Sequence, residues 1–520
     1  MPSAAISPVG LPRPARVAPV ALSHLAALCG GMLAGTDVAV GGVTAASSQV
    51  RAGDLFAGVP GRSVHGARFA SDAAASGAAA VLTDPAGRSA VPAELPVLLV
   101  QDVRLALGPV AAEVYGRPSH DLPVLGVTGT SGKTTTTFLV RAGLQAAGRP
   151  SGLIGTVATL IGDEAVITGF TTPEAPDTQA LLAVMCEQGA QAVAMEVSSH
   201  ALAMGRADGI EFAVGAFTNL SQDHLDFHAG MDDYFVAKAR LFDGRARAAV
   251  IVTDDDWGRR MASIAGPEAV TVSTTGDGSA TWQARDIAVS PDGGTTFRVL
   301  GPGVELDTGC SVPGRYNVAN ALLALAILAE IGVPPVLAAP AIAIASVPGR
   351  MERIDAGQLF LAVVDYSHKP AAVDGALRTL RPLTRGRLVV VLGCGGDRDG
   401  AKRPRMGEIA TRGADLLIVT DDNPRSEDPA TIRRAMLDGA LAVPPAERGE
   451  VREVGDRAEA IAAAVASAAT GDTVLVAGKG HETGQEVAGV VHPFDDRDVL
   501  RAALEAMSAR AKSRKGTTTR

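Results

Sequence analysis

The sequence is poor in cysteine, in aromatic residues and in long hydrophobic runs. Four cysteines occur in 520 residues, none of them in a C-x-x-C pair: Cys29, Cys186, Cys310 and Cys394. This count and spacing suit a reducing compartment and exclude a zinc site built on cysteine pairs. Aromatic residues make up 3% of the chain, so its hydrophobic cores must be built mainly from Ala, Val and Leu.

Membrane-spanning and nucleic-acid-binding signals are also lacking. No apolar run reaches the roughly 18 residues that a membrane-spanning helix needs. Prolines interrupt the start of the chain where a signal peptide needs an apolar core, so we expect a disordered leader at 1–19 and a cytoplasmic protein. The formal net charge of −9 argues against a general nucleic-acid binder. The basic segment 506–520 is expected to be a solvated tail.

A chain of this length is too long for one hydrophobic core, and its loop signals predict three α/β domains. We expect a small α/β N-terminal domain at 20–120. A central domain with a phosphate-loop-type parallel sheet should follow at 121–347, and a C-terminal Rossmann-like domain at 348–505.

The central feature of the sequence is a glycine-rich turn between a predicted strand and a predicted helix, within 121–148. The turn reads Gly129-Thr130-Ser131-Gly132-Lys133-Thr134-Thr135. Glycines let backbone N–H groups turn inward, the helix N-terminus favours anions, and Lys133 can reach the terminal phosphates of a nucleotide. The Thr134 hydroxyl is placed to bind the accompanying Mg²⁺.

This turn departs from the strict G-x-x-x-x-G-K-[ST] pattern, because the first glycine would fall on Val127 while Gly126 lies one residue earlier. The alternative is a glycine turn with an incidental lysine. The strand before the turn and the helix after it are the context that a phosphate loop requires, so we interpret the turn as a nucleoside-triphosphate site.

Two further strands of the central domain are predicted to end in polar residues. Glu196 follows one strand and is a natural Mg²⁺ ligand, unless it caps a helix. The stretch 218–228 follows the other and includes His224, unless it is a solvated loop. Lys238 lies among apolar residues of a predicted helix, where it could simply snorkel to solvent. Asn317 at a helix start suits a nucleotide contact or an N-cap equally well.

Strands of the third domain are also predicted to end in charged and glycine-rich loops that face one crevice. These loops contain the arginines Arg398 and Arg425 and the carboxylates Asp422 and Glu482. An arginine can bind a carboxylate through two hydrogen bonds, and a carboxylate can bind an ammonium group. The crevice therefore suits a zwitterionic amino acid; the alternative is an ordinary set of solvated loop charges.

With these residues in place, the chain resembles the Mur ligase family, ATP-dependent amide ligases of peptidoglycan precursor synthesis. The resemblance covers most of 38–500. It rests on an ordered series of segments: GVTGTSGKTTT, TTP, EVSSHAL, TNLSQDHLDFH, YFVAKARLF, GRYNVANALLA, PGRMERID, VDYSHKP, GCGGDRDGAKRPRMG, TDDNPR and GKGHE. The shifted first glycine is itself normal for this family.

The resemblance implies that ATP phosphorylates a substrate carboxylate and that an amine then attacks the acyl phosphate. It implies Mg²⁺ held by Thr134, Glu196, His224 and Lys238, with Lys238 present as a carbamate (N6-carboxylysine). The implied catalytic residues are Lys133, Glu196, His224 and Lys238. Asn317, Arg350 and Asp365 match further ATP-binding positions.

The resemblance also implies the nucleotide-linked substrate, UDP-MurNAc-L-Ala-D-Glu. The residues that match its contacts are Ser48, Arg62, Ser63, Val64, Thr171, Thr172, Ser198 and Arg206. Met204 stands where a glutamine contact is expected and cannot supply the hydrogen bonds of that amide, so no contact is assigned to it. Ser367 replaces an alanine that commonly precedes the histidine, a minor departure.

The amino acid to be added is implied by residues that match the diaminopimelate-adding branch of the family: Arg398, Asp422, Asn423, Pro424, Arg425, Gly478 and Glu482. Arg425 can pair with the second carboxylate of meso-diaminopimelate, which lysine lacks. A lysine-adding ligase of the same family remains the alternative.

Two further hypotheses assign the chain to a different ligase or to a non-enzymatic protein. A folylpolyglutamate-synthase-like ligase should lack both the first domain and the segment 422–425. A non-enzymatic nucleotide switch would leave the amino-acid crevice unexplained. The resemblance implies a monomer, with no nucleic-acid partner and no membrane span.

Overall fold

The computed structural model describes residues 11–61, 63–289, 294–312 and 314–517, with side chains to 509. These residues form two compact units. The first takes in the chain to Ile287 with Phe297–Gly309 and Arg315–Ala345; the second takes in Ala288–Thr296, Cys310–Gly314 and the chain from Ser346. No helix within the described ranges has the length and apolar character needed to cross a bilayer.

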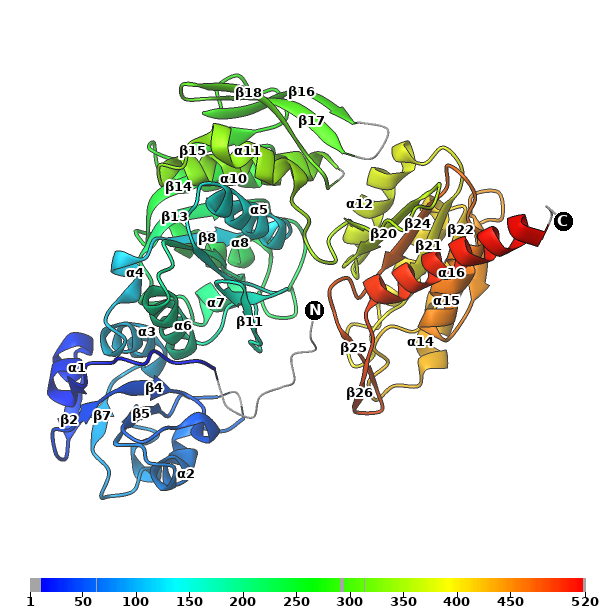
Figure 1. Cartoon of the computed structure of the whole chain (residues 1–520). Coiled ribbons are helices and arrows are strands. Elements are labelled where there is room, and N and C mark those ends of the chain that lie inside the picture. The colour runs from blue at the N-terminus through cyan, green and yellow to red at the C-terminus, as the bar shows by residue number, and fades with distance from the viewer. Residues whose placement is uncertain (1–10, 62, 290–293, 313, 518–520) are drawn as a thin grey trace. The chain divides into compact units, whose positions relative to one another are not determined.

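The first unit begins with a five-stranded sheet in the order β2-β7-β6-β5-β4 (Figure 1). Its strands are β2 Met32–Ala34, β4 Gly42–Thr44, β5 Asp54–Ala57, β6 Ala80–Thr83 and β7 Val97–Leu99. The helices α1 Leu22–Cys29, α2 Ala70–Ala75 and α3 Val103–Val114, the short α4 Pro118–Asp121 and the pair β1 Val20–Ala21 and β3 Ala39–Val40 complete this part. Gly30, in the left-handed region at φ 63°, ends α1.

The same unit contains an eleven-stranded sheet in the order β11-β10-β9-β12-β8-β13-β14-β15-β16-β17-β18. The strands from β9 through β16 in that order run parallel. They are β8 Val124–Thr128, β9 Ser151–Ile154, β10 Thr159–Ile161, β11 Glu164–Val166, β12 Ala192–Glu196, β13 Phe212–Phe217, β14 Ala246–Val252, β15 Val270–Ser273, β16 Trp282–Val289, β17 Thr295–Gly301 and β18 Val304–Cys310.

Helices cover this parallel sheet as the pattern of alternating strands and helices predicts. They are α5 Lys133–Ala146, α6 Ala175–Glu187, α7 Ser199–Ala203, α8 Met231–Ala239, α9 Asp256–Ala265, α10 Arg315–Glu330 and α11 Pro335–Ile344. The strand β8 is buried along its whole length, which explains its nearly continuous apolar sequence. It lies between β12 and β13, so the loops after these three strands meet at one sheet edge.

The second unit has a six-stranded sheet in the order β19-β20-β24-β21-β22-β23, parallel except for β19. Its strands are β19 Glu352–Arg353, β20 Leu361–Asp365, β21 Leu388–Leu392, β22 Leu416–Val419, β23 Glu450–Glu453 and β24 Thr473–Ala477. A hairpin of β25 Gly484–Val487 and β26 Val490–Pro493 follows, and the helices are α12 Pro370–Leu380, α13 Lys402–Gly413, α14 Pro429–Ala442, α15 Arg457–Ser467 and α16 Asp496–Thr517.

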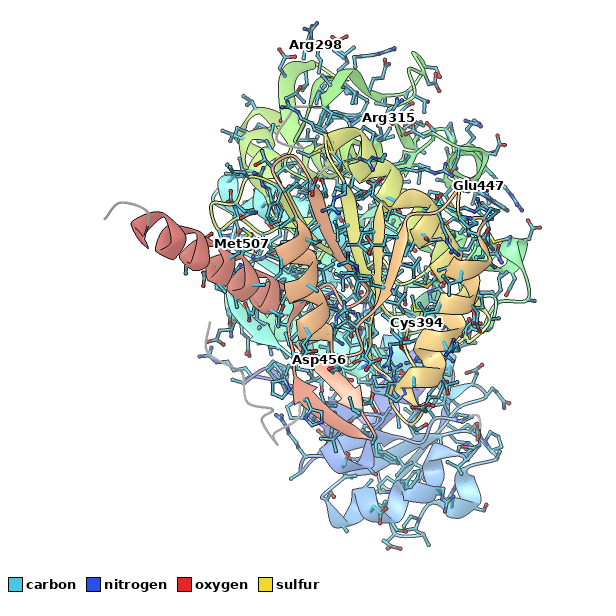
Figure 2. All side chains as sticks on the ribbon, turned by 90° about the vertical axis from the view of Figure 1, so that its right-hand side faces the viewer. Arg298, Arg315, Cys394, Glu447, Asp456 and Met507 are labelled. Atoms are coloured by element: carbon cyan, nitrogen blue, oxygen red, sulfur yellow. The ribbon has the colours of Figure 1, made fainter. Side chains whose placement is uncertain are left out.

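This second sheet has a hydrophobic core on each face. Val390 packs in the core that contains Met406 of α13, whereas its neighbour Val391 packs in the core that contains Leu500 of α16. Alternate side chains of a strand point to opposite faces, and here both faces are apolar. Cys394, just after β21, is buried in the first of these cores (Figure 2). The predicted α/β class, with a parallel central sheet and a Rossmann-like third part, is confirmed.

The prediction of a disordered leader is wrong for residues 11–19, and residues 1–10 lie outside the described residues. Residues 11–19 of the predicted leader are held by specific contacts: Arg13 Nη1 lies 2.6 Å from Asp54 Oδ2, and the N–H groups of Ala15 and Arg16 each donate to Glu187. Such contacts leave no periodic pattern in the sequence. At the other end, α16 continues to Thr517, into the predicted tail 506–520.

Candidate active site

The glycine-rich turn lies between β8 and α5, where the sequence places it. Gly129 and Gly132 have φ of 148° and 87°, backbone conformations that only glycine adopts easily. A side chain at Gly129 would collide with Thr218. The helix α5 begins at Lys133, so its first N–H groups and the positive end of its dipole lie at the turn. This is the geometry of an anion site.

The turn is held in place by the segment that follows β13. Asn219 makes three hydrogen bonds to it: its carbonyl accepts from Thr130 N at 2.9 Å, its Oδ1 from Ser131 N at 3.1 Å, and its Nδ2 donates to Ser131 O at 3.2 Å. The Thr218 hydroxyl donates to Ser131 O at 2.6 Å. Sequence reasoning did not assign this role to Asn219; its position directly after a buried strand was the available signal.

Two lysines meet at one carbonyl of the turn. The Nζ of Lys133 donates to Gly129 O at 2.8 Å, and the Nζ of Lys238 donates to the same oxygen at 2.9 Å. Lys238 is 1% exposed and lies over the Tyr234 ring, 4.3 Å from Nζ to the ring centroid. The alternative that Lys238 snorkels to solvent is therefore wrong.

Glu196 is the last residue of β12 and is 1% exposed. Its Oε1 accepts from Thr156 N at 2.9 Å and its Oε2 from the Thr156 hydroxyl at 3.0 Å. The following helix α7 is capped by Ser198, whose Oγ accepts from Ala201 N at 3.2 Å. The alternative that Glu196 is a helix cap is therefore wrong, and the carboxylate is held by Thr156, which sequence reasoning missed.

His224 lies in a cluster of rings. It adopts a φ of 52°, and its Nε2 lies 3.3 Å from Asp223 Oδ2. Its ring centroid is 4.7 Å from that of His200 and 6.1 Å from that of Tyr234, the ring that also packs on Lys238. Burial, together with the neighbouring His228, lowers the pKa of His200. The predicted loop 218–228 is thus packed through its rings.

The predicted metal ligands are a hydroxyl, a carboxylate, an imidazole and a modified lysine. Within the described ranges, no group of three or more His, Cys, Asp or Glu side chains could hold a metal ion by itself. A set with few protein ligands fits Mg²⁺, which keeps several waters and shares phosphate oxygens of its substrate. The set of Thr134, Glu196, His224 and Lys238 stays a prediction.

Part of the predicted UDP-substrate set is joined to Glu196 by hydrogen bonds. The Thr172 hydroxyl donates to Glu196 O at 2.8 Å and accepts from Ser198 N at 3.1 Å. The hydroxyl of Thr171 lies 2.9 Å from that of Thr156. These contacts bring Thr171, Thr172 and Ser198 together beside the end of β12.

Arg206 of the same set is mostly buried and already has partners. Its Nε lies 3.0 Å from Glu174 Oε1, and its guanidinium lies 4.1 Å from the centroid of the Phe170 ring. Arg104 pairs with the other oxygen of Glu174 at 2.7 Å. The two arginines and Glu174 form one charged cluster, which sequence reasoning did not foresee.

The predicted contacts in the first part of the chain are less closely grouped. Ser48 lines a cavity of about 140 Å³ together with Arg13 and Asp177. Burial and the nearby Glu174 raise the pKa of Asp177 to about 6. Ser63 and Val64 lie in an exposed loop, and Arg62 lies outside the described residues.

The three further positions predicted to bind ATP each make specific contacts in their own surroundings. Asn317 is 2% exposed, lies within the first turn of α10 and accepts from Asn320 Nδ2 at 3.1 Å, so it is not the N-cap. Asp365 accepts from Met351 N at 2.7 Å and from Ser367 N at 2.9 Å. The Arg350 guanidinium lies 4.4 Å from the centroid of the Tyr366 ring. Burial raises the pKa of Tyr366 to about 12.

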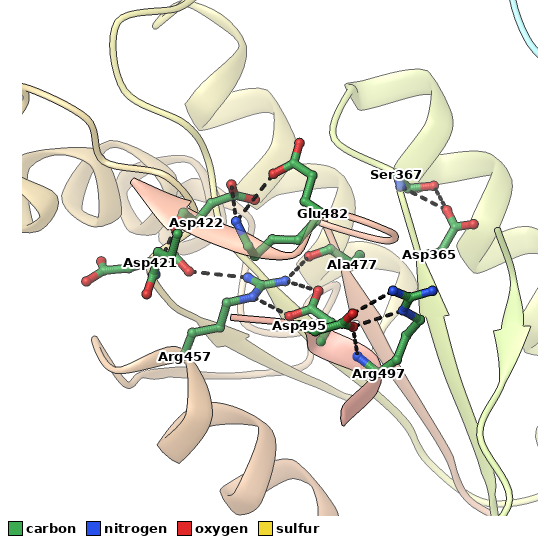
Figure 3. A network of polar contacts seen from close by, with 12 residues as sticks. Asp365, Ser367, Asp421, Asp422, Arg457, Ala477, Glu482, Asp495 and Arg497 are labelled. Atoms are coloured by element: carbon green, nitrogen blue, oxygen red, sulfur yellow. Dashed lines mark hydrogen bonds and ion pairs between the residues drawn. The ribbon is translucent and has the colours of Figure 1, made fainter. Parts of the chain in front are cut away.

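The loops after β22 and β24 bring charged side chains together in the second unit, where the sequence predicts an amino-acid crevice (Figure 3). The Asn423 Nδ2 donates to Glu482 Oε2 at 2.8 Å, and Asp422 is 7% exposed. Gly478 has a φ of 120°, and a side chain there would press on the Asp422 carboxylate. Lys479, which sequence reasoning did not select, is fully buried among these residues.

Arg425 is held at the edge of this crevice in a left-handed backbone conformation, with φ of 52°. Its Nη1 donates to Gly396 O at 2.7 Å, and its Nε lies 3.3 Å from Glu486 Oε2. The peptide of Arg425 also pairs with the hairpin, through hydrogen bonds to Glu486 and Ala488. Arg398 lies exposed in the loop after β21, and Pro424 O accepts from Glu427 N at 3.1 Å.

Comparison with known families matches three consecutive segments of the chain. Residues 39–115 match the Mur ligase family catalytic domain, residues 127–328 the Mur ligase middle domain, and residues 349–480 the Mur ligase glutamate ligase domain. The three matches follow the order of the three sheets described above.

Relatives of known name match over nearly the whole chain. UDP-N-acetylmuramoyl-L-alanyl-D-glutamate–2,6-diaminopimelate ligase of Streptomyces coelicolor is 53% identical over 500 residues, which are 95% of this chain and 98% of that protein. The protein of the same name from Corynebacterium glutamicum is 52% identical over 479 residues, 90% and 92% of the two chains. A solved structure with this ligase name is 30% identical, with a TM-score of 0.68, and covers 94% of this chain and all of its own. The chain therefore belongs to the Mur ligase family of ATP-dependent ligases.

Proposed function

We propose that this ligase joins meso-diaminopimelate to UDP-MurNAc-L-Ala-D-Glu and so forms the UDP-MurNAc-tripeptide of peptidoglycan precursor synthesis. The observation that carries the proposal is the crevice of the second unit, where Arg425 borders a cluster that contains Asp422 and Glu482. The far end of diaminopimelate carries both an ammonium and a carboxylate. The carboxylates of Asp422 and Glu482 can bind the ammonium, and Arg425 can bind the carboxylate. The names of the relatives from S. coelicolor and C. glutamicum support it.

The reaction has two steps. An oxygen of the free substrate carboxylate attacks the terminal phosphorus of ATP; the new O–P bond forms as the bond to ADP breaks. The amine of diaminopimelate then attacks the acyl carbon, and the tetrahedral intermediate loses phosphate and a proton to give the amide. The turn at 129–135 would bind the phosphates, with Lys133 on the transferred group.

Bound Mg²⁺ would screen phosphate charge during the transfer. Thr134, Glu196, His224 and the carbamate of Lys238 are the residues that would hold it. The burial of Glu196 and its two hydrogen bonds from Thr156 support this role, because a positioned carboxylate is a good ligand for a hard cation. The burial of Lys238 beside Gly129 supports a role at the phosphates.

The remaining assignments belong to the same proposal. Residues 20–120 would bind the UDP part of the substrate through Ser48, Arg62, Ser63 and Val64. The central domain at 121–347 would bind ATP and the peptide part, through Thr171, Thr172, Ser198 and Arg206. The third domain at 348–505 would bind diaminopimelate. We expect the enzyme to work as a monomer in the cytoplasm.

Arg425 distinguishes diaminopimelate from lysine in this proposal. With lysine as substrate, Arg425 would face no second ligand carboxylate and would keep only its ion pair with Glu486, so its charge would add nothing to substrate binding. The lysine-adding alternative therefore makes no use of Arg425. The segment 422–425 and the first sheet, both present here, also argue against a folylpolyglutamate-synthase-like ligase.

The test is phosphate release with ATP and UDP-MurNAc-L-Ala-D-Glu, comparing meso-diaminopimelate with L-lysine. Release that depends on diaminopimelate is the expected result. Release with lysine alone would keep the ligase and overturn the specificity, and release with neither would overturn the proposed substrate. Omitting each substrate in turn is the control, because a ligase hydrolyses little ATP alone.

A further inference from the structure

The crevice of the second unit contains a buried cation that none of the roles above explains. Lys479, directly after Gly478, is fully buried, although a lysine is rarely found without solvent contact. Its Nζ donates to Asn423 Oδ1 at 2.9 Å and lies 3.3 Å from Glu482 Oε2 and 4.0 Å from Asp422 Oδ1. Its partners are thus three of the residues predicted to bind the amino acid.

These contacts fix the orientation of the Asn423 side chain. Its Oδ1 accepts from Lys479 Nζ and from Glu486 N at 3.0 Å, while its Nδ2 donates to Glu482 Oε2 at 2.8 Å. A flipped amide would turn its NH₂ group toward the ammonium of Lys479 and lose these bonds. Lys479 therefore selects the orientation in which Asn423 donates to Glu482.

The same contacts fix one oxygen of Glu482. Both Lys479 and Asn423 bind Oε2. Figure 3 shows the other carboxylate oxygen of Glu482 outside the dashed contacts. The Glu482 side chain is 35% exposed, so this second oxygen can be reached from the crevice. A carboxylate held at one oxygen presents the other in a defined direction, which suits a single ammonium group.

The formal charges of the cluster lead to the same conclusion. Asp422 and Glu482 carry two negative charges and Lys479 one positive charge. The neighbouring Arg457 is balanced by Asp496, so one negative charge is left for a ligand. One ammonium group would neutralise it. Without Lys479, Asp422 and Glu482 would lose their direct cationic partner, because the buried Arg457 nearby is already paired with Asp496.

We propose that Lys479 is a positioning residue of the amino-acid site, which holds Asn423 and one oxygen of Glu482 so that the other oxygen receives the ammonium group at the far end of the amino-acid substrate. This rests on the proposed function, because it assigns a role within the same site. Lys479 itself does not touch the substrate.

The experiment is a double-mutant cycle on the full-length enzyme with Lys479→Met, Glu482→Gln and the double variant. The readouts are KM for meso-diaminopimelate, KM for ATP and kcat. Lys479→Met should raise KM for diaminopimelate on the order of 10- to 100-fold, the effect of losing a hydrogen bond to a charged group, and leave KM for ATP unchanged. The double variant should be little worse than either single variant, because both changes act through one carboxylate.

Two results would overturn the proposal: an unchanged KM for diaminopimelate in Lys479→Met, or additive effects in the double variant. If Lys479→Met does not fold, Lys479→Arg, which keeps the charge, takes its place in the cycle. Additive effects of Lys479→Arg and Glu482→Gln on KM for diaminopimelate would again overturn the proposal. Arg433→Met is the matched control, because Arg433 pairs with Asp421 and Glu453 and contacts neither Asp422 nor Glu482 in the described structure. Failure of the wild-type enzyme to use diaminopimelate would instead refute the proposed function.

Discussion

The proposed nucleotide turn and the proposed amino-acid crevice are built in opposite ways. The turn is one continuous stretch, 129–135, that offers backbone N–H groups and a helix end to its ligand. The crevice gathers side chains from loops after β22 and β24 and from the hairpin beside them. A phosphate can be bound by backbone geometry, which a short motif specifies, whereas the proposed zwitterion site combines Asp422 and Arg425 of one loop with Glu482 of another.

The two sites also differ in what holds them rigid. The turn is fixed from outside by Asn219 and Thr218, residues that need not touch the ligand. In the crevice, the proposed ligand-binding residues are tied to one another, as Asn423 is to Glu482. Changes near the turn should therefore affect ATP turnover, and changes in the crevice should affect mainly the KM of the amino acid.

The largest effect is expected for Lys238→Ala, which removes the buried amine beside Gly129 O. We expect kcat for phosphate release to fall on the order of 10³-fold, because a positioned charged group at the transferred phosphate is lost. Labelling with ¹³C-bicarbonate should give a carbamate NMR signal in the wild-type enzyme that is missing in the variant. Arg240→Ala, which loses a bond to Leu202 O, is the control. Wild-type activity in Lys238→Ala would make this lysine purely structural.

In the crevice, Arg425→Ala should raise KM for diaminopimelate on the order of 10²-fold, because the substrate carboxylate loses its charged partner. KM for ATP should not change, in contrast to changes at the turn. Steady-state kinetics with each substrate varied in turn measure both constants, with Arg433→Ala as the control. An unchanged KM for diaminopimelate would refute the assignment of Arg425.

Acid should weaken the second unit through two partly buried histidines. Burial, with nearby positive charges, lowers the pKa of His368 to about 4 and that of His481 to about 3, from 6.5 in the unfolded chain. Between pH 4 and pH 6.5 the unfolded state binds more protons than the folded state. The stability contributed by these histidines is therefore full above pH 6.5 and is lost as the pH falls toward about 4. For one such histidine the loss by pH 5 is on the order of 2 kcal/mol.

Urea unfolding at a series of pH values tests this dependence. Trp257 and Trp282 both belong to the first unit, so fluorescence follows that unit, whereas circular dichroism follows the whole chain. The circular dichroism midpoint should fall between pH 6.5 and 5, and less so in His368→Gln. A midpoint that stays constant over this range would show that the histidines titrate normally.

The smallest effect is expected for Asn219→Ala. The variant removes two side-chain hydrogen bonds to Ser131 but leaves the turn sequence intact. We expect KM for ATP to rise about 10-fold and KM for diaminopimelate to stay constant. Gln222→Ala, an exposed change in the same segment, is the control. Equal changes in both KM values would show that the two sites are not held independently.

Local patterns in the sequence predicted the elements best. The β8–turn–α5 unit, the strand Phe212–Phe217 and the ends of β20, β21, β22 and β24 lie where apolar runs and glycines place them. The surroundings of individual side chains were not predicted by these patterns and depend on how the folded chain packs. The sequence allowed Lys238 to snorkel and Glu196 to cap a helix, and only the fold shows the first buried at Gly129 and the second bonded to Thr156.

The sequence by itself determined the α/β class, the position of the glycine-rich turn between β8 and α5, and the family, because each depends on residues that are close together in the chain or on ordered motifs. Tertiary structure alone decided that Asn219 holds the turn, that residues 11–19 are bound to the first unit, and that Lys479 lies buried among three proposed ligand-binding residues. These contacts join segments whose pairing leaves no periodic or local pattern. Their energies depend on burial and on geometry, which appear only when the chain is folded.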